Sequence, residues 1–153
     1  MTSGARLLLL AAVAGVAASS APHTAQAGST ATIVLEVSTF RNMNGFLGCQ
    51  LYSKEEGFPD NWQSQAHLRK RVAVTGKTTS CTYPNMPPGT YAAAVIHDEN
   101  SNGKLDKNFL GVPTEAYGIS NNHTHALSRP TWNESKFVVN ADTTVTAHIS
   151  LRY

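Results

Sequence analysis

Short segments with alternating apolar residues are the feature that most constrains what this chain folds into. In the stretch TIVLEVSTF, residues 32–40, Ile33, Leu35 and Val37 occupy every second position. On an extended strand these three side chains lie on one face, so they are expected to point into a core. After the N-terminal leader, no segment keeps apolar residues at helical spacing over three turns. The pattern therefore predicts an all-β domain.

The next segment continues the alternation. Residues 45–53, GFLGCQLYS, place Leu47, Cys49 and Leu51 on one face of a strand. The pair Asn44-Gly45 lies just before it, and such a pair supplies the positive φ angles of a tight hairpin turn. We therefore expect residues 32–40 and 45–53 to pair as a β-hairpin.

Turn residues separate the remaining strand candidates. These candidates are residues 71–76, 78–84, 91–97, 135–141 and 143–153. Two polar connections, residues 54–70 and 99–129, divide them, and the first is expected to hold a short helical turn near Gln63–Leu68. Seven short strands without βαβ spacing predict a single antiparallel β-sandwich, Ig-like or transthyretin-like, with long polar loops.

The N-terminus has the pattern of a signal peptide. Arg6 precedes an apolar run at residues 7–18, and Ala25-Gln26-Ala27 offers the small residues that signal peptidase accepts. The apolar run is too short to span the hydrocarbon core, which takes roughly 20 residues. We expect cleavage after residue 27, a mature domain at residues 28–153 without a transmembrane segment, and a periplasmic or extracellular location.

Charge and cysteine content narrow the class further. Twelve Lys and Arg, less Arg6, leave eleven against ten Asp and Glu, so the mature net charge is near +1. Such a balance gives no long-range field for nucleic acid or an anionic membrane, and no nucleic-acid partner is expected. In an exported chain, Cys49 and Cys81 are expected to form a disulfide, since neither lies in a recognisable Cys-His motif.

A ten-residue segment, HDENSNGKLD at residues 97–106, has the spacing of a calcium loop. The expected metal ligands are Asp98, Asn100, Asn102, the carbonyl of Lys104, and Asp106. Alternate residues of such a loop aim oxygen atoms inward, Gly103 allows the sharp turn, and hard oxygen donors favour calcium over zinc or copper. The alternative is a polar turn in which Asp and Asn side chains accept backbone N–H groups.

One position departs from the calcium-loop pattern. The EF-hand loop ends with a bidentate glutamate at position twelve, where this chain has Phe109. The loss of that ligand predicts weak affinity, with a dissociation constant of roughly 0.1 to 1 mM. Glu99 and Glu115 are the candidates to complete the coordination shell.

Two stretches carry resemblances to known families. PPGTYAAAV, residues 87–95, resembles the turn and strand of transthyretin-like and carboxypeptidase-regulatory-like sandwiches. The longer motif PPGTYAAAVIHDENSNGKLDKNFLGVPTEAYGISNN, together with RNMNGFLGCQLYS, resembles the secreted bacterial domain of unknown function family 2141. This resemblance implies a β domain but no established activity.

Histidines provide a rival hypothesis. His123 and His125 share one face if that segment is extended, and His97 adjoins the loop. In this hypothesis the three histidines hold zinc, iron or copper, with Glu115 or Tyr117 as a further ligand, in a small secreted metalloenzyme. No G-x-S-x-G, H-E-x-x-H or phosphate-binding glycine motif is present.

Taken together, these patterns favour an exported β-sandwich that acts as a binding or accessory module with a calcium-stabilised loop. Residues 109–122 would form its recognition surface, for a carbohydrate or another cell-envelope ligand. A histidine-based metalloenzyme and a purely structural envelope protein are the alternatives.

Overall fold

The structure is a computed structural model that describes residues 29–60, 66–123 and 128–153. The expected signal peptide, residues 63–65 of the expected helical turn, and His125 lie outside the described residues. No helix among the described residues is long and apolar enough to cross a membrane. The elements in chain order are β1 (Ala31–Ser38), β2 (Phe46–Tyr52), β3 (Leu68–Ala73), β4 (Thr78–Met86), β5 (Gly89–Asp98), β6 (Ala116–Ile119), the 3₁₀ helix η1 (Ser120–Asn122), α1 (Trp132–Ser135), β7 (Phe137–Val139) and β8 (Thr144–Ser150).

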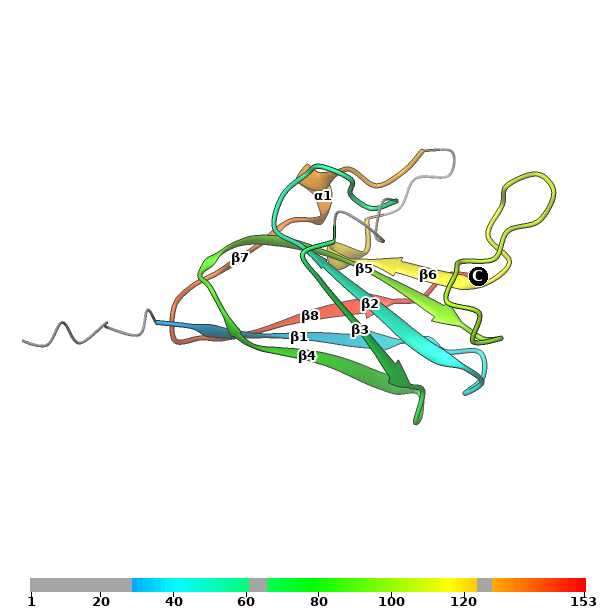
Figure 1. Cartoon of the computed structure of the whole chain (residues 1–153), viewed down its shortest axis with the longest axis horizontal. Helices are drawn as coiled ribbons and strands as arrows, with labels where there is room; N and C mark the ends of the chain where they lie inside the picture. The colour runs from blue at the N-terminus through cyan, green and yellow to red at the C-terminus, as the bar shows by residue number, and fades with distance from the viewer. Residues whose placement is uncertain (1–28, 61–65, 124–127) are drawn as a thin grey trace, which may run out of the picture.

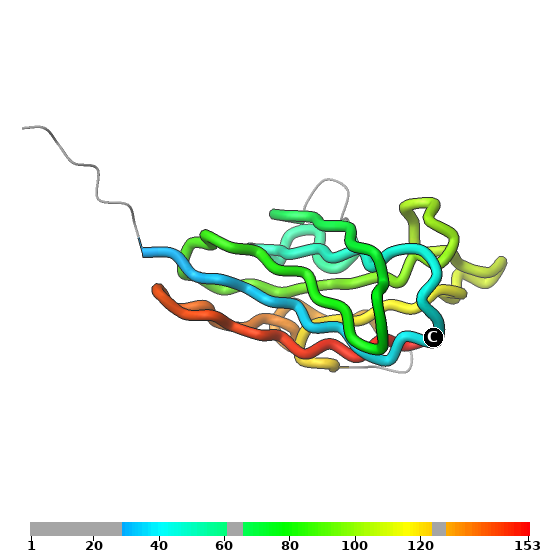
Figure 2. The backbone as a smooth tube through the Cα atoms, turned by 90° about the horizontal axis from the view of Figure 1, so that it is seen from below, coloured from blue at the N-terminus to red at the C-terminus, as the bar shows by residue number. Residues whose placement is uncertain are grey.

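Two sheets pack face to face, which confirms the predicted β-sandwich (Figure 1). One sheet has the order β4-β1-β8, and Figure 2 shows β1 between its two neighbours. The other sheet has the order β3-β2-β5-β6, and β7 also pairs with β5. The pairing of β1 with β8 is parallel, whereas the other pairs of named strands are antiparallel.

The core lies between the sheets and follows the alternation in the sequence. Ile33, Leu35 and Val37 of β1 are fully buried, and so are Leu47 and Leu51 of β2. Burying such side chains supplies most of the free energy that favours folding.

The expected disulfide is present. Cys49 on β2 is bonded to Cys81 on β4, with 6.5 Å between the two Cα atoms. Because β2 and β4 belong to different sheets, this bond joins the two layers covalently.

The predicted hairpin between residues 32–40 and 45–53 is wrong. β1 pairs with β4 and β8, whereas β2 pairs with β3 and β5. The connection between β1 and β2 crosses from one sheet to the other, with positive φ at Thr39 and Gly45. A Cβ on Gly45 would lie 1.9 Å from the carbonyl oxygen of Asp98. The glycine therefore serves a close approach to β5 instead of a tight hairpin turn.

Two other expectations need correction. The connection at residues 99–129 is not free of regular structure, because β6 pairs with β5 within it. The segment 135–141 is not one continuous strand, because Ser135 closes α1 and only Phe137–Val139 is extended. A capping box starts α1: Thr131 and Glu134 each accept a hydrogen bond from the other's backbone N–H.

Candidate functional site

The loop that follows β5 begins at a buried carboxylate. This loop projects from the end of the sandwich opposite the start of β1 (Figure 1). Asp98, the last residue of β5, is only 3% exposed. Its Oδ1 accepts the N–H of Asn102 at 2.9 Å, and its Oδ2 accepts the N–H of Gly103 at 2.8 Å. The chain therefore folds back over the Asp98 carboxylate, and Gly103 has the positive φ that this turn requires.

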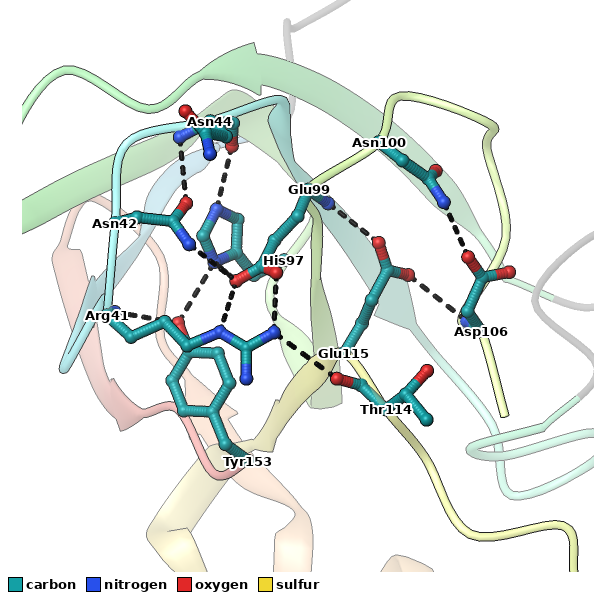
Figure 3. Close-up of polar contacts among 10 residues, drawn as sticks. All are labelled: Arg41, Asn42, Asn44, His97, Glu99, Asn100, Asp106, Thr114, Glu115 and Tyr153. Atoms are coloured by element: carbon teal, nitrogen blue, oxygen red, sulfur yellow. Dashed lines mark hydrogen bonds and ion pairs between the residues drawn. The ribbon is translucent and has the colours of Figure 1, made fainter. Parts of the chain in front are cut away.

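Two of the other predicted ligands meet at Asp106. The Asn100 amide donates to its carboxylate at 2.6 Å, and the Asn102 amide donates to both carboxylate oxygens at 2.9 and 3.0 Å (Figure 3 draws the Asn100 contact). The amide oxygen of Asn102 accepts the N–H of Lys104 at 2.8 Å. The two asparagines reach Asp106 through their NH2 groups, while their amide oxygens accept backbone N–H groups, as in the polar-turn alternative. The calcium ligand set stays a prediction.

Glu115 fastens the two ends of the loop together. It precedes β6 and is only 5% exposed. One carboxylate oxygen accepts the N–H of Glu99 at 2.8 Å, and the other accepts the N–H of Asp106 at 3.1 Å (Figure 3). Both of its oxygens are therefore engaged by the loop backbone.

Glu99 belongs to a different cluster. Its carboxylate accepts hydrogen bonds from Arg41, at 2.7 Å from Nε and 2.5 Å from a terminal nitrogen, and from the Asn42 amide at 3.1 Å (Figure 3). The hydrogen bonds from Arg41 lower the pKa of Glu99, against the opposing effect of its partial burial. The expectation that Glu99 completes a metal shell has no support in this geometry.

A chain of hydrogen bonds surrounds the buried ring of His97. Its Nε2 lies 2.8 Å from the carbonyl oxygen of Asn44, which only accepts, so Nε2 carries the proton. Its Nδ1 lies 3.0 Å from the hydroxyl of Tyr153, and that hydroxyl accepts the backbone N–H of Arg41 at 2.8 Å. With the proton on Nε2 of a neutral ring, Nδ1 accepts a hydrogen bond from the Tyr153 hydroxyl. Burial raises the pKa of Tyr153.

The described residues do not assemble the histidine site. Both ring nitrogens of His97 are engaged, and His97 lies opposite Ala116 at the start of β6. The chain then runs toward the other end of β5, where Ile119 pairs with Ala94, before it reaches the exposed His123. Among the described residues, no group of three or more His, Cys, Asp or Glu side chains is arranged to hold a metal. The ligands expected for calcium are not such a group, because they include two asparagines and a carbonyl.

A groove of about 400 Å³ lies on the outer face of the five-stranded sheet, beside the loop. Ala94, Ile96 and Tyr117 line the sheet side, and Lys104 and Lys107 belong to the wall that the loop contributes. Gln50 also lines the groove and is only 4% exposed. A buried amide that faces a groove is a ready polar contact for a ligand.

Sequence reasoning missed the groove and the cluster around His97. Arg41, Glu99 and Tyr153 are far apart in the chain, and no spacing rule links them. Glu115 was expected as a possible ligand, but its role as a fastener of the loop was not foreseen.

The comparisons with known proteins identify the family. A family model described as "Uncharacterized protein conserved in bacteria (DUF2141)" matches residues 35–147, well over half of the 153-residue chain. The chain belongs to the DUF2141 family. This match confirms the resemblance inferred from the sequence motifs. It includes the loop, Glu115 and both cysteines of the DUF2141 domain. No curated protein and no solved structure matches the chain.

Proposed function

We propose that this DUF2141 protein is an exported binding or accessory module whose loop Asp98–Asp106 holds one calcium ion. The proposed ligands are the side chains of Asp98, Asn100, Asn102 and Asp106 and the carbonyl of Lys104. The observation that carries the proposal is the convergence of Asn100 and Asn102 on Asp106, in the turn that also encloses Asp98.

The chemistry of the donor set fits calcium. Carboxylate, amide and carbonyl oxygens are the ligands that this cation takes in proteins. Among the described residues, the Asp106 side chain contacts only neutral amide groups and forms no ion pair. The nearest cationic atom to the Asp98 carboxylate belongs to Arg71, at 3.6 Å. A divalent cation would compensate the two carboxylates more fully than these partners do.

The expected affinity is weak. Phe109 stands where a calcium loop of the EF-hand type has its bidentate glutamate, and Glu99 is engaged by Arg41. Glu115 contributes by holding the loop backbone rather than by binding the ion. We therefore expect a dissociation constant of roughly 0.1 to 1 mM, as in extracellular calcium modules.

Calcium would affect ligand binding in the groove by ordering the loop that forms one of its walls. Lys104, Leu105 and Lys107 form part of its wall, and they lie within or next to the calcium loop. An ion that orders this loop therefore orders one side of the groove. Export is inferred from the leader at residues 1–27, and the disulfide suits an oxidising compartment. A carbohydrate or another cell-envelope component is the proposed ligand class.

Thermal unfolding of residues 28–153 tests the calcium proposal. At 10 mM calcium, a dissociation constant of roughly 0.1 to 1 mM predicts about 1.4 to 2.7 kcal/mol of added stability, which raises Tm by several degrees. Asp98→Ala and Asp106→Asn should abolish the rise, and magnesium should reproduce little of it. Asp142→Asn is the matched control, because residue 142 lies in an exposed turn whose positive φ asparagine tolerates.

The same experiment separates the alternatives. An unchanged Tm of the wild-type domain in calcium would refute the calcium site. Copurification of a transition metal, lost on His97→Ala but kept in Asp98→Ala, would favour the metalloenzyme. A domain that shows neither response would fit a purely structural envelope protein.

A further inference from the structure

The connection between β5 and β6 carries a small hairpin that its own hydrogen bonds hold in shape. Lys107 pairs with Pro113 in a bridge, and the N–H of Asn108 donates to the carbonyl of Val112 at 2.9 Å. The side-chain oxygen of Asn108 accepts the N–H groups of Leu110 and Val112, each at 3.0 Å. These bonds fix the backbone of the turn without help from the rest of the sandwich.

This hairpin presents apolar side chains to water. Phe109 is 95% exposed, Leu110 is 72% exposed and Val112 is 54% exposed. We call these three residues the apolar tip. Scattered apolar residues on a surface are normal, but a preformed turn that groups three of them marks a surface that another phase or molecule covers.

Two lysines stand at the base of the apolar tip. Lys104 and Lys107 are exposed, and neither side chain forms an ion pair or hydrogen bond with the described residues. With Arg71, which lies 3.6 Å from the Asp98 carboxylate, the two lysines equal in number the carboxylates of Asp98, Asp106 and Glu115, so the summed charge of this part of the loop is close to zero without a cation. One bound calcium ion would raise its charge to about +2. The local charge thus favours an anionic surface, although the net charge of the domain does not.

The small size of the apolar tip favours a lipid surface over a protein as its partner. A stable protein interface covers about 800 Å² on each partner, far more than three side chains on a projecting turn offer. Insertion into a bilayer surface needs only a few apolar side chains at headgroup depth, with basic residues beside them. The tip lies on the loop that projects beyond the end of the sandwich, where a flat surface can reach it (Figure 1).

We propose that the apolar tip inserts into the surface of an anionic lipid bilayer, with Lys104 and Lys107 against the lipid phosphates. Insertion depends on Phe109 and Leu110. Its strengthening by calcium rests on the proposed function, because the ion changes the charge of the loop. No covalent chemistry is involved.

Cosedimentation of residues 28–153 with vesicles tests this proposal. The probes are vesicles of phosphatidylglycerol and phosphatidylcholine, and vesicles of phosphatidylcholine alone, each with calcium or with chelator. The double variant Phe109→Ser/Leu110→Ser should lower partitioning to the anionic vesicles at least tenfold. Lys104→Gln/Lys107→Gln should lower it by about fivefold per lysine, since each basic residue contributes that much near an anionic surface. The carbonyl of residue 104 is unchanged in that variant.

Matched controls keep the proposal falsifiable. Met43→Ser/Val138→Ser removes two other exposed apolar side chains, 60% and 64% exposed, and should bind vesicles as the wild type does. Phe109→Ser/Leu110→Ser should keep the calcium-induced rise in Tm, which shows that the loop is still folded.

The outcomes separate the two proposals. No binding of the wild type to anionic vesicles, or equal binding by the tip variant, would overturn the lipid proposal even if calcium raises Tm. Tip-dependent binding that is the same in calcium and in chelator, with no rise in Tm, would support lipid insertion and refute the calcium site.

Discussion

Gly45 and Asp98 approach so closely that a Cβ added to Gly45 would lie 1.9 Å from the Asp98 carbonyl oxygen. This contact sets the connection between β1 and β2 against the start of the proposed calcium loop. The carbonyl of Asn44 reaches His97 beside it, and Arg41 reaches Glu99 (Figure 3). The loop is therefore supported from behind by a segment that precedes it by more than fifty residues.

Gly45→Ala should destabilise the fold more than the same substitution at a glycine that also has positive φ but has no atoms close to the added Cβ. Gly111 is the matched control, because its φ is also positive and nothing lies within 4 Å of its added Cβ. Gly111→Ala should cost about 1 kcal/mol for the backbone conformation alone. Gly45→Ala should cost about 1 to 3 kcal/mol more, since the added atom overlaps the backbone. Urea unfolding of both variants measures the difference, and equal losses would show that the contact is unimportant.

Glu115→Gln should weaken both the fold and calcium binding. Glutamine has one acceptor oxygen, so one of the N–H groups of Glu99 and Asp106 loses its partner. The expected loss of unfolding free energy is about 1 to 3 kcal/mol, as for other buried groups left without a partner. Denaturant unfolding and calcium titration measure the two effects. Glu55→Gln, in an exposed position, is the control, and an equal response from both variants would contradict the role of Glu115.

Stability should fall in acid partly through Glu99. Its pKa is lowered in the folded state, chiefly by the hydrogen bonds from Arg41. A lowered pKa means that the contribution is present above the ordinary value of 4.5 and is lost as pH falls through the lowered value. Urea unfolding from about pH 6 down to pH 3 should therefore show a steeper loss in the wild type than in Glu99→Gln. Parallel pH profiles would mean that the Arg41 contact adds no stability.

Reduction of the disulfide should destabilise the domain without removing the calcium response. The bond between Cys49 and Cys81 spans 32 positions of sequence, and a closed loop of that length is worth about 3 to 4 kcal/mol. Guanidinium unfolding with and without reductant measures the loss, and Cys49→Ala/Cys81→Ala should reproduce it. A variant as stable as the oxidised wild type would show that the link between the sheets is dispensable.

The sequence predicts the layers of this fold better than their connections. The alternation of Ile33, Leu35 and Val37 reports which face of β1 is buried, because that property is local. The Asn44-Gly45 pair led to a wrong hairpin prediction. Gly45 has its positive φ where the chain packs closely against Asp98, which is distant in the sequence. Local pattern does not record whether a strand stays in its sheet or crosses to the other one.

The same distinction applies to the candidate site. Asn100 and Asn102, which the spacing grouped with Asp106 as metal ligands, are in hydrogen-bond contact with it. Their role as metal ligands stays a prediction. Spacing was not enough to tell Glu99 from Glu115, because Arg41 decides where the Glu99 carboxylate goes. Contacts between distant segments determine which of two equivalent carboxylates remains near the loop.

Isothermal titration of residues 28–153 with calcium tests the central claim most directly. The account predicts saturable binding of one ion per chain, with a dissociation constant of roughly 0.1 to 1 mM, which is lost in Asp98→Ala and kept in Asp142→Asn. The absence of saturable binding by the wild type, or unchanged binding by Asp98→Ala, would contradict it.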